Sequence, residues 1–250
     1  MKRVLGKKQT ITNQQWIDAM EHIEEYVTRE ELEELVGKTR EDIRIQTEGK
    51  KAAYAWSAGK DSIVLGRICE MENITDCVLA VTDLEYPEFM AWVDAHKPSG
   101  LTIINTGQNI EWLKKHPNML FPETSKEASQ WFHIVQHRAQ AKYYKEHELD
   151  MLLLGRRRAD GNYVGKGSNI YTNGQGITRY SPLADWTHEA VLAFIHYYDV
   201  DIPPIYGWPN GYLCGTHPWP ARQWTHGNGW EEIAQIDKKL AREAKKKLGI

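Results

Sequence analysis

The sequence predicts an α/β protein with a doubly wound, mostly parallel sheet, helices on both faces of that sheet, and helical N- and C-terminal extensions. Three observations lead to this fold class. Short apolar runs alternate with segments of helical periodicity from about residue 50 onward. A turn of small residues joins the first apolar run to the helix after it. At 250 residues, the chain can bury about 70–75% of its unfolded surface, so one α/β core with appendages accounts for its length.

Residues 1–49 are expected to form a helical N-terminal extension. Thr12 and Gln15 have the spacing of a capping box, with Thr12 as the N-cap. Apolar residues then recur near helical spacing, at Ile17, Met20, Ile23 and Val27. A further acidic helical segment is expected to end at Gly37, and its charged face is interpreted as a solvated face.

Residues 50–205 are expected to form the α/β domain. After the first run, strands are predicted at 77–82, 101–105 and 151–154. Helices are predicted after residue 62, from Pro87 onward, around 110–113, over 127–147 as one helix, and from Thr187 as N-cap through Ile195. Ligands of such sheets bind beyond the carboxyl ends of the strands, near the point where the strand order reverses, so functional residues are expected there.

Residues 206–250 are expected to form a third part of the chain. A run rich in Gly, Pro and Trp up to Trp230 is interpreted as an ordered loop. Residues 231–248 predict one basic amphipathic helix.

Composition narrows the class of protein. Three cysteines without a Cys-x-x-Cys pair argue against an iron–sulfur cluster and fit a reducing compartment. The sequence shows neither the apolar core of a signal peptide nor a run of membrane-spanning length, which predicts a cytoplasmic protein without a membrane partner. The formal net charge of −3 means that any contact with nucleic acid must come from a local basic patch.

The turn after the first predicted strand has the composition of a phosphate-binding loop. It reads Ser57-Ala58-Gly59-Lys60-Asp61-Ser62. Gly59 can take backbone angles that other residues avoid, and Asp61 or Ser62 can cap the following helix. The helix N-terminus and the Lys60 ammonium both attract anions. The spacing is neither that of a Walker A loop nor that of a dinucleotide-binding loop, and a turn without a ligand is the alternative interpretation.

These residues resemble the Ser-Gly-Gly-Lys-Asp-Ser signature of the PP-loop ATP pyrophosphatases, a branch of the adenine nucleotide alpha hydrolase-like superfamily. Ala58 stands where the first glycine is usual in that signature. If position 58 needs a positive φ, its Cβ costs roughly 1 kcal/mol.

Further elements, in the same order along the chain, are similar to those of the phosphoadenosine phosphosulfate (PAPS) reductase family. They are Asp83 with Tyr86-Pro87-Glu88, Gly155-Arg156-Arg157, Pro182-Leu183-Ala184-Asp185-Trp186, and Ile202-Pro203 to Gly211-Tyr212. The likeness covers about residues 50–225. It implies an adenine nucleotide alpha hydrolase-like fold and an adenine nucleotide as partner, held by residues 57–62, Thr82, Asp83, Gly155 and Arg156.

Independently of the likeness, Arg156, Arg157 and Arg158 follow a predicted buried strand, where guanidinium groups can hold phosphate or sulfate oxygens. Lys166 adds a basic turn nearby, and a solvated surface cluster is the alternative.

The leading hypothesis is an enzyme that cleaves the α–β phosphate bond of ATP and transfers AMP to an acceptor. Lys60, Asp61, Arg156 and Arg157 are the catalytic candidates, and Asp61 is the candidate ligand of Mg²⁺. Candidate acceptor-binding residues are Arg157, Arg158, Lys166, Asp185, Cys214 and His217. The lysine half of the loop resembles ATP-using relatives such as the small subunit of ATP sulfurylase and the sulfur-handling protein of DNA phosphorothioation.

Two alternatives stay open. One is a thiol-dependent PAPS reductase, using Cys214 or an external thiol, although the chain lacks the C-terminal Glu-Cys-Gly-Leu-His segment of such reductases. The other is a nucleotide- or nucleic-acid-binding module without turnover, using the basic C-terminal helix and the aromatic loop before it as a contact surface. The sequence leaves the acceptor open between a small oxyanion, a nucleic acid and a protein, and it leaves open a homo-oligomer.

Overall fold

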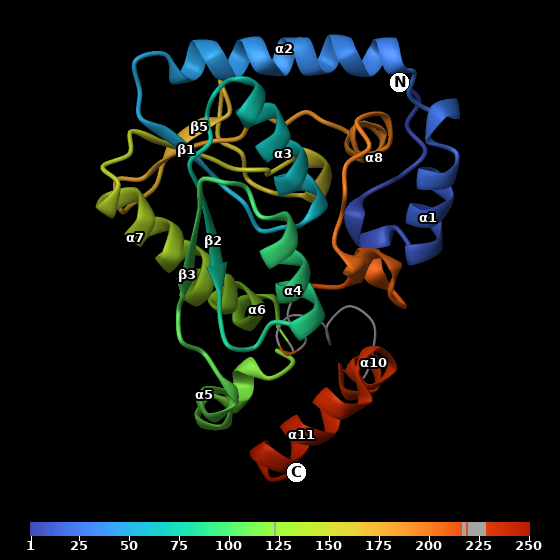
Figure 1. Cartoon of the computed structure of the whole chain (residues 1–250), viewed down its shortest axis with the longest axis vertical. Helices are drawn as coiled ribbons and strands as arrows, with labels where there is room; N and C mark the ends of the chain where they lie inside the picture. Colours follow the sequence, from blue (N-terminus) through green and yellow to red (C-terminus); the bar gives the residue numbers. More distant parts are fainter. Residues whose placement is uncertain (123, 217–218, 220–228) are drawn as a thin grey trace. The chain divides into compact units, whose positions relative to one another are not determined.

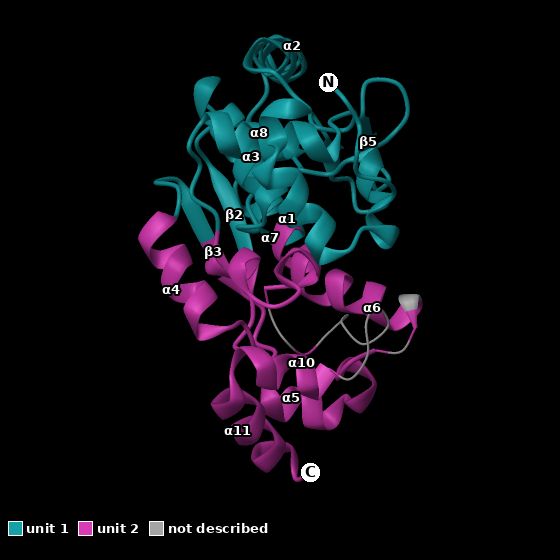
Figure 2. Cartoon of the chain, turned by 90° about the vertical axis from the view of Figure 1, so that its right-hand side faces the viewer, with its two compact units in different colours: residues 1–79, 97–102, 141–202 teal, residues 80–96, 103–140, 203–250 magenta. Residues whose placement is uncertain are grey.

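The computed structural model describes residues 1–122, 124–216, 219 and 229–250 (Figure 1). The chain divides into two compact units, coloured teal and magenta in Figure 2. Unit 1 comprises Met1–Leu79, Lys97–Thr102 and Ala141–Ile202, and unit 2 comprises Ala80–His96, Ile103–Gln140 and Pro203–Ile250. Each unit is therefore assembled from separated stretches of chain, whereas the sequence-based division uses three consecutive ones; that division stays a prediction.

A six-stranded sheet has the order β3-β2-β1-β4-β6-β5. Its strands are β1 (Ala52–Ala55), β2 (Cys77–Val81), β3 (Leu101–Asn105), β4 (Met151–Leu153), β5 (Ile170–Thr172) and β6 (Thr178–Tyr180). β1 pairs in parallel with β2 and with β4, β4 pairs in parallel with β6, and β5 is antiparallel to β6. The predicted mostly parallel, doubly wound α/β fold is thus confirmed.

The strand order places the reversal point at β1. The chain moves from β1 to β2 and β3 on one side, and then returns to β4 on the other side of β1. Loops that follow β1 and β4 consequently meet at the edge where ligands of such sheets bind. A Cβ added to Gly155, just after β4, would lie 3.0 Å from the Asp61 carbonyl oxygen, which shows how closely the two loops approach.

Unit 1 contains the helices α1 (Asn13–Glu21), α2 (Arg29–Thr47), α3 (Lys60–Met71) and α8 (His188–Tyr197). The predicted Thr12 capping box and the Thr187 N-cap are both confirmed. The predicted helix end at Gly37 is wrong, because α2 continues through it and buries Thr39 and Ile43 beyond it. α8 packs against α1, α2 and α3, and its residues 188–195 are all buried.

Unit 2 contains α4 (Pro87–His96), α5 (Ile110–Lys115), α6 (Ser125–Phe132), α10 (Gly229–Ile236) and α11 (Lys238–Leu248). The predicted single helix over 231–248 is wrong, because Asp237 leaves the helical conformation, with φ −143°, and its side chain caps α11 at Leu240 N. The core of this unit gathers Leu84, Leu113, Met119, Phe121, Trp131, Val135, Trp219, Ile233, Ala241 and Ala244.

The helix predicted over 127–147 is present as one uninterrupted helical stretch that contains a π-helical turn. It runs from α6 through a π-helical turn, η4 (His133–His137), into α7 (Arg138–Glu146). The shorter 3₁₀ turns are η1 (Lys8–Thr10), η2 (Ile23–Glu25), η3 (Pro117–Met119), η5 (Arg158–Asp160), η6 (Pro204–Gly207) and η7 (Gly211–Leu213).

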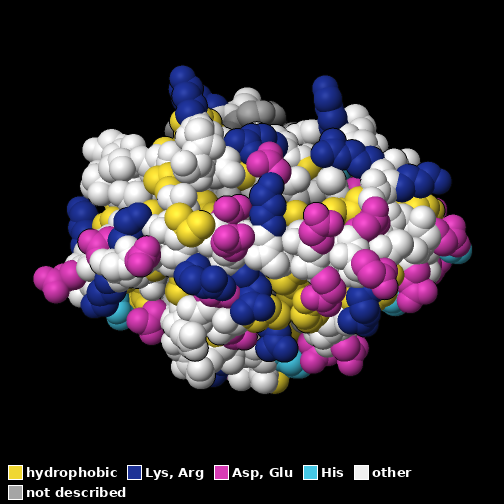
Figure 3. All heavy atoms as spheres, turned by 90° about the horizontal axis from the view of Figure 1, so that it is seen from above, with side chains coloured by type: hydrophobic (Ala, Val, Ile, Leu, Met, Phe, Trp, Pro, Cys, Tyr) yellow, Lys and Arg dark blue, Asp and Glu magenta, His cyan; other side chains and the backbone are white. Residues whose placement is uncertain are grey.

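The surface on the α2 side carries mixed charge. Figure 3 shows Lys and Arg side chains interspersed with Asp and Glu side chains there, with hydrophobic side chains between them. In the described part of the chain, no helix combines the length and the apolar character needed to cross a membrane.

Candidate functional site

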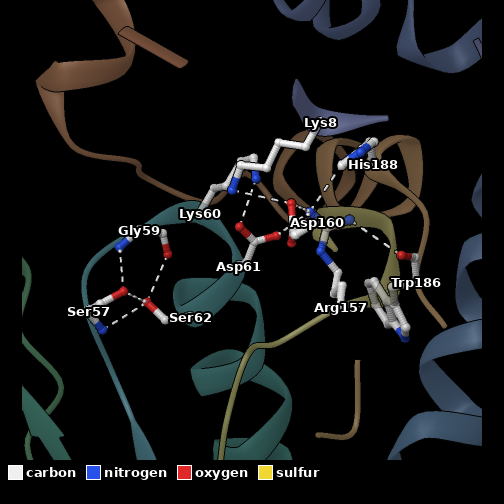
Figure 4. A network of polar contacts seen from close by, with 10 residues as sticks. All are labelled: Lys8, Ser57, Gly59, Lys60, Asp61, Ser62, Arg157, Asp160, Trp186 and His188. Atoms are coloured by element: carbon white, nitrogen blue, oxygen red, sulfur yellow. Dashed lines mark hydrogen bonds and ion pairs between the residues drawn. The ribbon is translucent and has the colours of Figure 1, made fainter. Parts of the chain in front are cut away.

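Two serine hydroxyls hold the loop between β1 and α3. Ser57 N and Ser57 Oγ lie 3.0 and 3.1 Å from Ser62 Oγ, and Ser62 Oγ donates to the Gly59 carbonyl oxygen at 2.9 Å. Gly59 N donates back to Ser57 Oγ at 3.4 Å. Figure 4 shows this hydroxyl cluster on one side of the loop. The loop is therefore folded by its own small polar residues, as their types predict.

The backbone strain of the loop falls on Ala58. Its φ is 54°, in the left-handed region that disfavours a Cβ by about 1 kcal/mol. Gly59, which was expected to use its conformational freedom, instead has an ordinary extended backbone with φ −81°. Position 58 therefore does have the positive φ at which a Cβ is unfavourable. It is also the position at which this loop has alanine where the PP-loop signature has glycine.

The N-terminus of α3 directly follows this loop. Gly59 is the N-cap, and among the described residues no side chain bonds to the first turn as a cap. The expected capping by Asp61 or Ser62 is wrong, because both lie within the first helical turn. A helix N-terminus of this kind keeps its partial positive charge available for an anion.

A chain of alternating charges runs from the loop toward η5 (Figure 4). Lys60 Nζ lies 2.7 Å from Asp61 Oδ2, and Arg157 Nη2 lies 2.7 Å from Asp61 Oδ1. Arg157 Nη2 also lies 3.1 Å from Asp160 Oδ2, and Lys8 Nζ lies 3.3 Å from Asp160 Oδ1. Each carboxylate thus sits between two cations, which stabilises the buried charges.

Burial makes these contacts strong. Lys60 is 5% exposed and Arg157 is 0% exposed. Burial by itself would raise the pKa of Asp61, but the charges of Lys60 and Arg157 outweigh it and hold this pKa below its usual value. Burial lowers the pKa of Lys60, and the Asp61 carboxylate opposes that effect. The Asp61 carboxylate therefore helps to keep the side chain of Lys60 in its charged, ammonium form.

Two aromatic side chains from α1 and α8 enclose the charges. Lys60 Nζ lies 4.9 Å from the ring centroid of Trp16, and the Trp16 and His188 rings meet edge to face at 4.8 Å. Arg157 Nη2 lies 3.2 Å from His188 Nδ1. Burial, and then the charge of Arg157, lower the pKa of His188 to about 4, so this ring is neutral at physiological pH and Nδ1 accepts from Arg157.

Sequence reasoning missed Lys8, Trp16, Asp160 and His188 as members of this site. Asp160 and His188 stand close to elements that were singled out, so their neighbours offered a weak signal. Trp16 and Lys8 offered none, because they come from the N-terminal segment and reach the loop only through tertiary packing.

The three arginines after β4 point to three different partners. Arg157 lies in the buried charge chain, whereas Arg156 Nη1 donates to the Tyr171 hydroxyl at 2.9 Å. Arg158 pairs with the exposed Asp185 at 2.5 Å and donates to Asn169 Oδ1 at 2.7 Å. They do not form one guanidinium cluster, and their expected contacts with ligand oxygens stay predictions.

Lys166 is exposed at the base of the β5–β6 hairpin, where its backbone bridges to Ile170. A strand pair at 170–180 was missed, although Asn173-Gly174 between two β-branched segments is a hairpin signal.

Other predicted site residues belong to unit 2. Thr82 N and Oγ1 both donate to the Glu85 carboxylate, and Asn105 Nδ2 donates to Asp83 Oδ1 at 2.7 Å. Cys214 is partly exposed and its thiol lies 3.7 Å from the Pro209 carbonyl oxygen. His217 lies outside the described residues. The functions expected of these residues stay predictions.

The expected role of Asp61 as a magnesium ligand stays a prediction. Each of its carboxylate oxygens lies 2.7 Å from a cation, Oδ2 from Lys60 Nζ and Oδ1 from Arg157 Nη2. A divalent cation beside Lys60 and Arg157 would meet two like charges. The described residues also contain no group of three or more His, Cys, Asp or Glu side chains placed to hold a metal ion.

Comparison with known proteins places this site in a family. The profile described as "Phosphoadenosine phosphosulfate reductase domain" matches residues 51–212. A phosphoadenosine 5'-phosphosulfate reductase of Aliivibrio fischeri (strain ATCC 700601 / ES114) is 21% identical over 208 residues, which cover 81% of this chain and 80% of that protein.

Two solved structures are similar in fold. The crystal structure of phosphoadenylyl-sulfate reductase from Candida auris, a phosphate complex, superposes with a TM-score of 0.52 at 19% identity, covering 73% of this chain and 94% of that one. NMN synthetase from Francisella tularensis gives a TM-score of 0.51 at 12% identity, covering 87% and 93%. The six-stranded sheet and these superpositions show an adenine nucleotide alpha hydrolase-like fold. Because the family model matches residues 51–212, which is more than half of the sequence, the chain belongs to the phosphoadenosine phosphosulfate reductase domain family.

Proposed function

We propose that this protein binds ATP at the Ser57–Ser62 loop and cleaves its α–β phosphate bond. An acceptor oxyanion attacks the α-phosphorus, the bond from that phosphorus to the bridging oxygen breaks, and AMP becomes attached to the acceptor while pyrophosphate leaves. The observation that carries the proposal is Lys60 in the first turn of α3, at a helix N-terminus to which no described side chain bonds as a cap, beside the close approach of the loop after β4. Backbone N–H groups, the helix dipole and an ammonium group together suit a leaving group that gains negative charge.

The loop residues have distinct proposed tasks. The hydroxyls of Ser57 and Ser62 and the N–H groups of the loop would hold the β- and γ-phosphates. Lys60 would neutralise the pyrophosphate as it leaves, exchanging its contact with Asp61 for one with a phosphate oxygen. Magnesium would enter with the ATP phosphates, since Asp61 is already occupied by two cations.

Arg157 is proposed to act through Asp61. Its side chain is completely buried and paired with two carboxylates, so it suits a positioning residue that keeps Asp61 ionised and Lys60 in place. The partly exposed Arg156 and the exposed Arg158 and Lys166 are better placed for an acceptor oxyanion. Thr82 and Asp83 are proposed to contact the ribose or adenine.

Reduction of phosphoadenylyl sulfate is the second candidate function, favoured by the names of the relatives in sequence. Of the three cysteines, Cys69 and Cys77 are buried, and burial raises the pKa of both thiols, that of Cys77 to about 12. They are therefore protonated and poor nucleophiles. The reaction would have to use Cys214 or an external thiol.

The test compares pyrophosphate release from magnesium-ATP, measured with sulfate and with nucleic acid added as acceptors, with sulfite release from PAPS in the presence of a dithiol reductant. Lys60→Met should lower pyrophosphate release by about 10²- to 10³-fold, the usual cost of removing one group that stabilises developing charge. Lys50→Met is the matched control, because Lys50 is exposed in the turn between α2 and β1. Ser57→Ala provides a milder second variant of the loop that leaves the buried charges intact.

Nucleotide binding can be followed separately. Lys60 faces Trp16, so a phosphate that draws Lys60 away should change the emission of that indole, and Trp16→Phe should remove this part of the signal. Pyrophosphate release that is equal in Lys60→Met and in the Lys50 control would refute the proposal. Sulfite release that is lost in Cys214→Ser would move the second function to first place, and binding without either product would indicate a module without turnover.

A further inference from the structure

The exposed face of α11 carries a dense cluster of positive charge. Six of its eleven residues are basic and one is acidic, in a chain whose formal net charge is −3. The basic residues are Lys238, Lys239, Arg242, Lys245, Lys246 and Lys247, and all are exposed. The acidic residue, Glu243, offsets one of them through an ion pair with Lys239 at 4.0 Å.

The spacing of these residues makes the cluster self-repulsive. Side chains three or four positions apart are neighbours on a helix, and like charges at these spacings destabilise it. Arg242 has a basic residue at each of its four such positions: 238, 239, 245 and 246. Within the part of the chain that the structure describes, no carboxylate is recorded in an ion pair with Arg242. The arrangement is unfavourable for the helix alone and favourable for a polyanion.

Helix stability accounts for only part of the cluster. The three lysines in the last turn complement the negative end of the helix dipole. Lys238 and Lys239 lie in the first turn, where the dipole disfavours cations, and Asp237 already caps that end. These first-turn lysines and Arg242 therefore need another explanation.

The opposite face of α11 is not available to a partner. Ala241 and Ala244 are 5% and 2% exposed, and Leu240 and Leu248 pack against the same core. A helix that inserts into a membrane surface needs a free apolar face, which α11 lacks. α11 packs against α5, and the last turn of α5 carries two further exposed lysines, Lys114 and Lys115.

We propose that the exposed face of α11 binds the phosphate backbone of nucleic acid without sequence preference. At about 1.5 Å per residue the helix is about 16 Å long, which matches about five nucleotides at about 3.4 Å per nucleotide. The chemistry recognised is a row of phosphodiesters, common to DNA and RNA. This inference goes beyond the proposed ATP chemistry and does not rest on it, because the two surfaces share no residue.

The experiment measures binding of the full chain to fluorescently labelled strands and duplexes of DNA and RNA, each about 20 nucleotides long, by anisotropy over a range of salt concentrations. Each phosphate contact contributes about 0.7–0.9 to the slope of log K against log salt. The variant Lys238→Gln, Lys239→Gln, Arg242→Gln should reduce that slope by about 2 and weaken binding by about 10- to 100-fold at moderate salt. Because the variant removes two cations from the end where the dipole disfavours them and relieves the repulsion around Arg242, α11 should stay folded.

The matched control is Lys38→Gln, Lys50→Gln, Lys142→Gln, which makes the same change in net charge at exposed lysines of unit 1. The control should bind like the parent protein, and so should Lys60→Met, whose defect tests only the ATP proposal. Equal loss in both triple variants would show a net-charge effect and overturn the assignment to α11. Binding to phosphatidylserine vesicles without binding to nucleic acid would also overturn it.

Discussion

Asp61 is the residue on which the buried charges of the site depend, so Asp61→Asn is a direct test of the site's energetics. Its carboxylate lies 2.7 Å from both Lys60 Nζ and Arg157 Nη2. The amide of asparagine keeps the shape and can still accept a hydrogen bond, but it removes the negative charge between two cations.

The magnitude follows from burial. The side chains of Lys60 and Arg157 are 6% and 0% exposed, and removing one partner of a buried ion pair costs about 3–5 kcal/mol. Arg157 keeps Asp160 at 3.1 Å and Lys60 keeps the Trp16 ring at 4.9 Å, which favours the lower end of that range. We expect a loss of about 3 kcal/mol in the free energy of unfolding, or about 6–12 °C in Tm for a chain of this size.

The assay is urea unfolding followed by far-UV circular dichroism, with Asp185→Asn as the control. Asp185 also pairs with an arginine, Arg158, but its side chain is 76% exposed. Surface ion pairs contribute less than about 1 kcal/mol, so the control should unfold close to the parent protein. A loss of stability that is the same in the two variants would refute the view that Asp61 compensates buried cations.

Two further predictions concern the same unit. Gly155→Ala should lower the free energy of unfolding by about 1–3 kcal/mol, because its Cβ would lie 3.0–3.2 Å from backbone atoms of Asp61 and Ser62 that have little room to move. The control is Gly174→Ala, which should be nearly neutral because no atom lies within 4 Å of its Cβ. Equal stability of the two variants would contradict the close approach of the two loops. The pKa of His188 is lowered from 6.5 to about 4, mainly by burial and then by a neighbouring arginine, so the unfolded chain takes up a proton at higher pH than the folded chain. Stability should therefore fall as pH falls through this window, by about 3 kcal/mol in total. In His188→Phe this contribution to the pH dependence should be absent. The measurement is the free energy of unfolding at several pH values, and the same dependence on pH in His188→Phe as in the parent protein would contradict the prediction.

Local sequence determined the elements of this protein and the chemistry of its loop. Thr12 and Thr187 cap helices and Pro87 opens one because such signals depend on residues within one helical turn. The Ser57–Ser62 loop was recognisable for the same reason: its hydroxyl contacts join residues at most five positions apart.

Tertiary structure decided which side chains complete the site. Three consecutive arginines, alike in sequence, end with a partly buried carboxylate, a tyrosine hydroxyl and an exposed aspartate as their partners. Trp16 reaches Lys60 from a helix more than forty residues earlier in the chain. Neither outcome is encoded by spacing, because the direction of each side chain is set by burial against segments that are distant in sequence. Periodicity and capping act within a turn of the chain, whereas the partners of a buried charge are chosen only when the whole unit packs.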